Sequence, residues 1–299
     1  MLTEDAKRAI ECLEEAPSDF ADAFSSALAA AKGRSIIDPS AESEHTLESY
    51  ATAAEVGAAL FRSANSSKGS IRAAIAGSLR EIASTGPQPY ADAATWVDAF
   101  WLAVICRDLN NADMLADIPV SLLRASGAVC DPYIYDWVEA LQAFWRGDPD
   151  QALGDKLVAA VEGCAPNALR ITEAEHVLKI VHPPMDLFYR FIVLDEEEGF
   201  DAALVEALEL HQSYYAETED RANEIQGLVS LPLLAITNLR CDTGWSIDVE
   251  SDYIPLHLVE AFEISQPARQ TAMCRSRETP PGPCGADCLA AESPPAGDP

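Results

Sequence analysis

Apolar residues recur at every third or fourth position along most of this chain, which is typical of amphipathic helices. The clearest stretch is residues 200–259, where two long helices are predicted. One face of the first carries Leu204, Leu208, His211 and Tyr215. One face of the second carries Leu228, Leu231, Leu234 and Leu239. Gly244 is expected to end the second helix, and Asp252 to cap a third helix with Pro255 in its first turn.

The same spacing predicts helices through the rest of the chain. The expected ranges are 3–16, 18–33, 38–63, 70–84, 91–109, 112–124, 131–146, 150–163 and 172–181. Thr172 and Glu175 have the spacing of a capping box, and Pro183 and Pro184 are expected to break the helix that follows. Residues 186–194 fit either a strand or a buried helix. The chain is therefore predicted to be all-α, an array of antiparallel helix hairpins similar to helical-repeat proteins.

Aromatic residues concentrate on two of these predicted helices. The first carries Trp96, Phe100, Trp101 and Ile105 at a spacing of about one turn. The second carries Tyr133, Trp137, Leu141, Phe144 and Trp145. Each buried aromatic side chain removes on the order of 150–250 Å² from water. This pair of helices is therefore the expected centre of the core, and a ligand pocket is the less favoured interpretation.

The character of the chain changes after Ser265. Residues 266–299 are rich in Pro, Gly, Ala and Ser and have no apolar period, so they cannot bury enough surface to fold. We expect residues 1–265 to form one helical domain and residues 266–299 a disordered tail. Three of the eight cysteines, Cys274, Cys284 and Cys288, lie in this tail without a histidine that could complete a zinc site.

The formal net charge of −29 narrows the choice of partners. An excess this large repels nucleic acid and anionic membranes, and it speeds association with a basic protein. The alternative interpretation is simply an acidic protein without such a partner. The first residues lack the basic and apolar regions of a signal peptide, and no stretch is apolar enough to cross a membrane, which together predict a cytoplasmic location.

Motifs that carry catalysis or cofactors are missing from the sequence. It has no phosphate-binding glycine loop, no HExxH zinc motif and no GxSxG nucleophile elbow. No two of its five histidines stand four residues apart. Asp108, Asp113 and Asp117 could bind a hard cation together, but separate solvated positions are favoured. We therefore expect no enzyme activity, no metal and no cofactor.

Two stretches are candidates for contact with a partner protein. The acidic run Asp195, Glu196, Glu197 and Glu198 could form a ridge facing a partner, although carboxylates also favour the positive end of a helix. The stretch from Trp245 to Tyr253 alternates Ile247 and Val249 with Asp248 and Glu250. This alternation places the carboxylates outward, beside Trp245 and Tyr253, a composition common in binding hot spots. The alternative is a loop packed onto the core.

The residues quoted so far also carry a family resemblance. FDAALVEALELHQSYY, LVSLPLLAITNLRCDTGW and VESDYIPLHLV resemble the C-terminal half of the immunity protein 49 family, and WLAVICRD and DWVEALQAFWRGD resemble its central part. The resemblance spans residues 90–259. It implies a mostly helical protein of bacterial polymorphic toxin systems, similar in role to an antitoxin, that binds and neutralises a cognate toxin. The family offers no catalytic residues.

The charge adds a hypothesis that the family does not supply. A basic toxin, such as a nuclease, would associate quickly with so acidic an inhibitor. Two rival interpretations stay open: a helical-repeat scaffold or adaptor that binds peptides or another protein, and an all-α enzyme whose site is assembled from distant helices.

Overall fold

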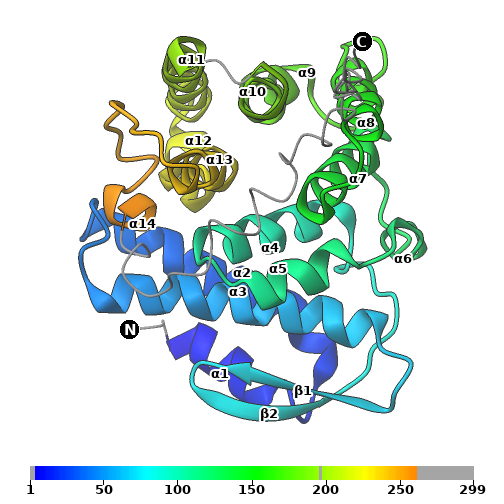
Figure 1. Ribbon diagram of the computed structural model, residues 1–299. Helices are drawn as coiled ribbons and strands as arrows, with labels where there is room; N and C mark the ends of the chain where they lie inside the picture. The colour runs from blue at the N-terminus through cyan, green and yellow to red at the C-terminus, as the bar shows by residue number, and fades with distance from the viewer. Residues whose placement is uncertain (1–3, 195–196, 261–299) are drawn as a thin grey trace, which may run out of the picture.

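The chain folds into stacked helices, which Figure 1 shows in a computed structural model that describes residues 4–194 and 197–260. The N-terminal half contains α1 (Glu4–Cys12), α2 (Phe20–Gly33), α3 (Glu44–Asn65), α4 (Ala93–Ile105), α5 (Leu109–Ala116) and α6 (Val120–Ala125). The C-terminal half contains α7 (Tyr133–Arg146), α8 (Asp150–Gly163), α9 (Ala174–His176), α10 (His182–Tyr189), α11 (Glu197–Tyr215), α12 (Glu219–Ala222), α13 (Leu231–Asp242) and α14 (Leu256–Glu260). Short 3-10 or π turns are η1 (Pro17–Asp19), η2 (Arg34–Ile36), η3 (Val177–Val181), η4 (Arg190–Leu194) and η5 (Ile225–Leu228).

Successive helices lie side by side over most of the molecule. Helix α2 packs on both α1 and α3, α3 packs on α4, α7 on α8 and α10 on α11. Helix α13 crosses back to pack on α4 and so joins the two halves, as Figure 1 shows. The predicted mostly helical fold is confirmed. The tail predicted for residues 266–299 lies outside the described residues.

The aromatic centre lies where α4, α7 and α10 meet. Trp96 stacks on Phe100 with ring centroids 5.0 Å apart, and Phe100 meets the edge of Trp145 at 5.6 Å. Phe188 of α10 contacts the rings of Trp101 and Trp137 at 6.4 Å and 5.4 Å. The prediction that α4 and α7 form the centre of the core is confirmed, and α10 completes it.

The helix predicted for residues 70–84 is wrong, because this segment forms an antiparallel hairpin. Strand β1 (Ser70–Ile75) pairs with β2 (Ser78–Ala83), with Ile71 opposite Ile82. Burial alternates along β1, with Ile71, Ala73 and Ile75 inward, which is the period of a strand. The turn residues Ala76 and Gly77 have φ of 52° and 73°, the two left-handed conformations that close a tight hairpin.

Two helix boundaries also differ from expectation. Pro183 and Pro184 do not break the chain's helical path, because they lie in the first turn of α10, where a missing N–H costs little. Residues 186–194 are accordingly helical, so the strand alternative is excluded. The capping box at Thr172 does not form: the buried Asp131 carboxylate accepts the backbone N–H groups of Arg170, Ile171 and Thr172 and holds this segment outside a helix.

The described cysteines form no disulfide bonds with one another. Cys164 is buried, whereas Cys12, Cys106, Cys130 and Cys241 are half-buried. The tail cysteines lie outside the described residues.

Candidate partner-binding site

The segment between α13 and α14, residues 244–255, runs across the surface without regular secondary structure. Gly244, at φ 91°, ends α13 as predicted. The side chains of Ile247 and Val249 pack against the core, whereas Asp248 and Glu250 are exposed, so the predicted alternation is present. Asp252 does not cap α14, because that helix begins at Leu256 and Leu258 donates its backbone N–H to the carbonyl of Pro255.

A buried arginine holds both ends of this segment. The Arg107 guanidinium donates to Asp242 Oδ1 at 3.1 Å, at the end of α13. It also donates to the carbonyls of Leu258 at 3.3 Å and Val259 at 2.7 Å, in α14. Asn238 of α13 donates to the same Leu258 carbonyl at 3.1 Å. The two flanking helices are thereby tied to the body at one point.

Further contacts set the course of the loop itself. The guanidinium of Arg240 lies 3.4 Å from the ring centroid of Trp245, a cation–π contact that covers one face of the indole. The backbone N–H of Ser230 donates to the carbonyl of Tyr253 at 3.0 Å. Trp245 is therefore half-buried rather than fully exposed.

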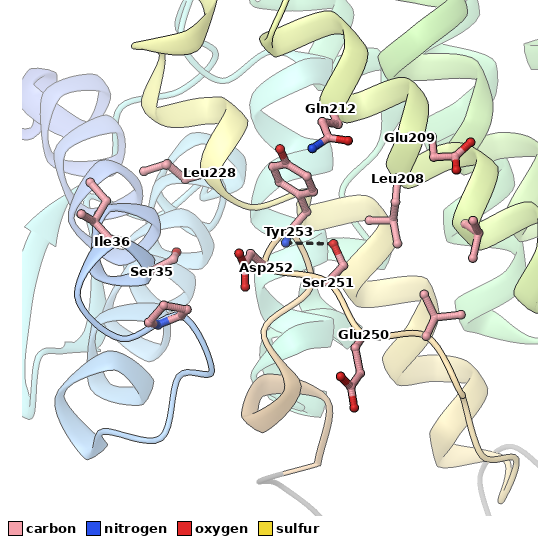
Figure 2. Close-up of a pocket in the computed structure, with 13 residues that line it drawn as sticks. Ser35, Ile36, Leu208, Glu209, Gln212, Leu228, Glu250, Ser251, Asp252 and Tyr253 are labelled. Atoms are coloured by element: carbon pink, nitrogen blue, oxygen red, sulfur yellow. Dashed lines mark hydrogen bonds between the residues drawn. The ribbon is translucent and has the colours of Figure 1, made fainter.

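A hollow of about 620 Å³ lies between this loop and α11, and Figure 2 shows its lining. Tyr253 stands near the middle, with Ser35 and Ile36 on one side and Leu208 and Glu209 of α11 on the other. Leu228 and Val249 add further apolar side chains to the lining. Ile36 and its neighbour Ile37 are 69% and 71% exposed, which is unusual for large apolar side chains.

A second hollow, of about 570 Å³, lies on the other side of the same loop. Trp245, Ile247 and Leu256 supply its apolar surface. Both hollows share the loop residues Val249, Glu250, Ser251 and Asp252. Residues 244–255 therefore form a ridge with an apolar depression on each flank, and we call this combined surface the loop face.

All the charged side chains that line the two hollows of the loop face are acidic. The carboxylates that line the two hollows belong to Glu209, Glu250, Asp252 and Glu260, and all four are exposed. No lysine, arginine or histidine is among the described residues that line either hollow. A surface with apolar depressions and an acidic rim is complementary to a partner that brings apolar anchors flanked by basic residues.

His211 supports this face from behind. Its Nε2–H donates to the carbonyl of Gly227 at 2.9 Å, and its ring lies 4.9 Å from that of Tyr253. Burial lowers the pKa of His211 to about 4, although the Gly227 hydrogen bond opposes this, so the ring is neutral at pH 7. His211 is therefore a hydrogen-bonded core residue, and its position behind Tyr253 gives it a structural role.

The predicted partner-binding residues are only partly brought together. Trp245, Glu250 and Tyr253 line the hollows of the loop face, and Asp248 projects from the ridge. Asp195 and Glu196 lie outside the described residues. Glu197 and Glu198 fall in the first turn of α11. Sequence reasoning missed Ile36, Ile37 and Glu209, of which the adjacent isoleucines in a predicted connection gave the only signal.

Asp108, Asp113 and Asp117, which were considered as ligands of one cation, have separate surroundings in the structure. Asp108 caps α5 by accepting the N–H of Asn111 at 3.1 Å, and Asp113 accepts the indole N–H of Trp145 at 2.7 Å. Asp117 is exposed at the end of α5. Within residues 4–194 and 197–260, no group of three metal-ligating side chains comes together. In the same residues, no helix combines the length and apolar content that crossing a membrane requires.

The structure defines a mostly α-helical protein with an acidic, hollowed loop face. The family model described as Immunity protein 49 matches residues 38–258, and the chain belongs to that family. The match begins in the segment before α3, at residue 38, and therefore reaches further toward the N-terminus than the resemblance noted above for residues 90–259. No curated protein and no solved structure matches the chain.

Proposed function

We propose that this immunity protein binds a cognate toxin through the loop face and neutralises it by stoichiometric occlusion, without turnover. Family membership supports the immunity role and a toxin partner in general. We choose the loop face because an acidic rim surrounds its apolar depressions. Four carboxylates and no basic group are among the described residues that line the two hollows.

The charge of the loop face also selects the kind of toxin. A basic domain, such as a nuclease that binds phosphate groups, would be attracted over a distance by the net charge of −29 and then held by the local rim. Glu250 and Asp252 line both hollows. If an apolar side chain of the toxin enters either hollow, basic residues next to it on the toxin would lie close to these two carboxylates.

Co-expression tests the function and the surface separately. The C-terminal domain of the protein encoded beside this gene is expressed in a sensitive host, alone and with the immunity protein. We expect growth to be rescued and the two proteins to co-purify in equal amounts. Failure of both would contradict the immunity role for this toxin and would favour the helical-repeat scaffold, which binds peptides without protecting cells.

Charge reversal then locates the surface. The double variant Glu250→Lys with Asp252→Lys is expected to abolish rescue, because it places two cations in the acidic rim. Asp117→Lys, an equally exposed carboxylate at the end of α5 and away from both hollows, is the matched control and should rescue fully. Rescue by the double variant would leave the immunity role standing and exclude the loop face as the contact surface.

The salt dependence of association supplies a kinetic check. If the acidic rim guides the toxin, the association rate falls steeply as salt is added, and the double variant shows a weaker dependence than wild type. A rate that is insensitive to salt in both proteins would point to an interface dominated by apolar contact.

A further inference from the structure

A second concave site lies in the middle of the molecule, away from the loop 244–255. This central cleft has a volume of about 530 Å³ and is lined by α2 and α4 from the N-terminal half of the chain and by α7, η3, α11 and η5 from the C-terminal half. Cavities of roughly 300–1,000 Å³ are the usual size of ligand sites. The cleft and the loop face have no lining residue in common.

The walls of the central cleft are rich in aromatic rings. The aromatic residues that line it include Tyr90 and Tyr215, which are half-buried, and Trp101, Tyr133 and Trp137, which are buried. They come from four different parts of the chain, so the cleft exists only because the two halves fold together. The faces of such rings attract cations, and sites built from several of them are the common solution for binding an alkylammonium group.

One carboxylate in this lining lacks a partner. Asp98 of α4 is half-buried, and among the described residues it has neither a hydrogen-bond donor nor an ion pair. Burial raises the pKa of the Asp98 carboxyl, while Lys32 lowers it and Asp92 raises it further. A carboxylate that is partly shielded from water and has no donor loses part of its hydration, so a cation placed next to Asp98 would supply the opposite charge and the hydrogen bonds that this carboxylate lacks.

The cation already in the cleft is directed elsewhere. Lys32 of α2 is 7% exposed, and its ammonium donates to the carbonyl of Gln226 in η5 at 3.1 Å rather than to Asp98. Burial lowers the pKa of Lys32, and Asp98 offsets part of this effect. The other basic groups of the lining are His176 and His211, and burial lowers the pKa of both, so they carry little charge at neutral pH.

We propose that the central cleft receives a lysine or arginine side chain of a partner polypeptide, with its charged end on Asp98 and its aliphatic stem between the aromatic rings. The stem of a long basic side chain packs well on apolar surface while its head reaches a carboxylate. The inference rests on the proposed function only in taking the partner to be a polypeptide. It does not depend on the loop face.

A small-molecule probe tests this site without any toxin. N-acetyl-lysine N-methylamide is titrated into the full-length protein and followed by calorimetry and by the NMR signals of the tryptophan indoles. N-acetyl-norleucine N-methylamide, which has nearly the same stem but no ammonium group, is the matched control probe. We expect the lysine probe to bind and the norleucine probe to bind about tenfold more weakly, as for loss of a charged hydrogen bond.

Two variants with opposite expected effects assign the binding to Asp98. Asp98→Asn should weaken binding of the lysine probe about tenfold, because the amide removes the negative charge. Lys32→Met should strengthen it, because the competing cation is gone. Asp117→Asn, an exposed carboxylate outside the cleft, should leave it unchanged.

Three results would overturn the proposal: no binding of the lysine probe, equal binding of the norleucine probe, or equal binding to wild type and Asp98→Asn. Circular dichroism checks that each variant folds. If a variant does not fold, the difference in affinity between the lysine and norleucine probes for the wild-type protein still tests the proposal. Because these titrations use no toxin, they can fail while co-expression still shows immunity, and the reverse holds as well.

Discussion

The aromatic centre and the loop 244–255 are held in place by different forces. Phe188 in the centre is fully buried and contacts the rings of Trp101, Trp137, Phe144 and Phe191. The loop packs two partly buried aliphatic side chains, Ile247 and Val249, and the buried Ile254 against the body, and Arg107 holds both of its flanks. Close packing fixes the centre cooperatively, whereas a few polar contacts fix the loop locally. The surface proposed to recognise the toxin is therefore on the segment that can change without unfolding the body.

The largest effect is expected in the aromatic centre. Phe188→Ala should lower the free energy of unfolding by about 3–5 kcal/mol, because it removes buried ring contacts and leaves a cavity. Urea unfolding followed by tryptophan fluorescence measures this value. Val129→Ala, at a side chain that is 81% exposed, is the control and should change stability by less than about 0.5 kcal/mol. A loss below about 1 kcal/mol for Phe188→Ala would mean that the centre is not cooperatively packed.

The clamp on the loop predicts a local effect instead. Arg107→Ala removes the donors that reach Asp242, Leu258 and Val259, and breaking a buried charged contact of this kind costs about 3 kcal/mol. Hydrogen exchange at the Leu258 N–H, which is bonded to Pro255, should report this loss as easier opening of α14.

The control for the clamp is Arg72→Ala, at an exposed arginine of β1. It should leave exchange in α14 unchanged. Equal losses of local protection and of global stability in Arg107→Ala would contradict the comparison, because the loop would then unfold together with the core.

His211, whose ring lies against Tyr253 of the loop, gives the stability of the protein a pH dependence. Its pKa is about 4 in the folded protein, below the usual value of 6.5, so the unfolded chain takes up a proton over a pH range in which the folded chain does not. The contribution of His211 to the free energy of unfolding is fully present above about pH 6.5. It falls as the pH drops toward 4, by up to about 3 kcal/mol.

The variant His211→Gln keeps a donor for Gly227 but does not titrate. Unfolding measured from pH 7 to pH 5, above the range in which most carboxylates titrate, should show a flatter dependence in this variant than in wild type. Identical slopes would mean that His211 gains its proton as readily in the folded protein as in the unfolded chain.

Local signals in the sequence were enough for most helices and for the aromatic centre. The 3.6-residue period placed Trp96, Phe100 and Trp101 on one buried helix, and Gly244 marked the end of α13. The hairpin was missed because Ala, Leu and Arg favour helices, yet the period of two at Ile71, Ala73 and Ile75 and the left-handed Ala76–Gly77 turn decide the structure.

The candidate sites were less accessible to such reasoning. The alternation in residues 245–250 is local and was predicted, so the outward carboxylates were found. The first hollow needs Ile36 and Glu209, which are far apart in the chain and come to one site only in the folded protein. The central cleft needs Asp98 and Lys32 from different helices, and neither residue stands out in the sequence.

The smallest effects test how closely the body itself is packed, through a matched pair of glycine substitutions. A Cβ on Gly57 of α3 would lie 2.8 Å from the Phe24 ring and 2.9 Å from Ala99 Cβ of α4, whereas a Cβ on Gly154 of α8 would meet nothing within 4 Å. Gly57→Ala should therefore cost about 1–3 kcal/mol through overpacking. Gly154→Ala should stabilise by about 0.5–1 kcal/mol, because alanine favours a helix.

Thermal and urea unfolding of both variants give the sign and the size of each change. A destabilising Gly57→Ala and a stabilising Gly154→Ala would show that the α3–α4 contact has no room for an added methyl group, whereas α8 has room at Gly154. The first result is expected for a body held by close packing. A neutral or stabilising Gly57→Ala would mean that α3 and α4 separate easily. The helical body would then adjust as easily as the loop 244–255, and the contrast between a rigid centre and an adjustable recognition surface would not hold.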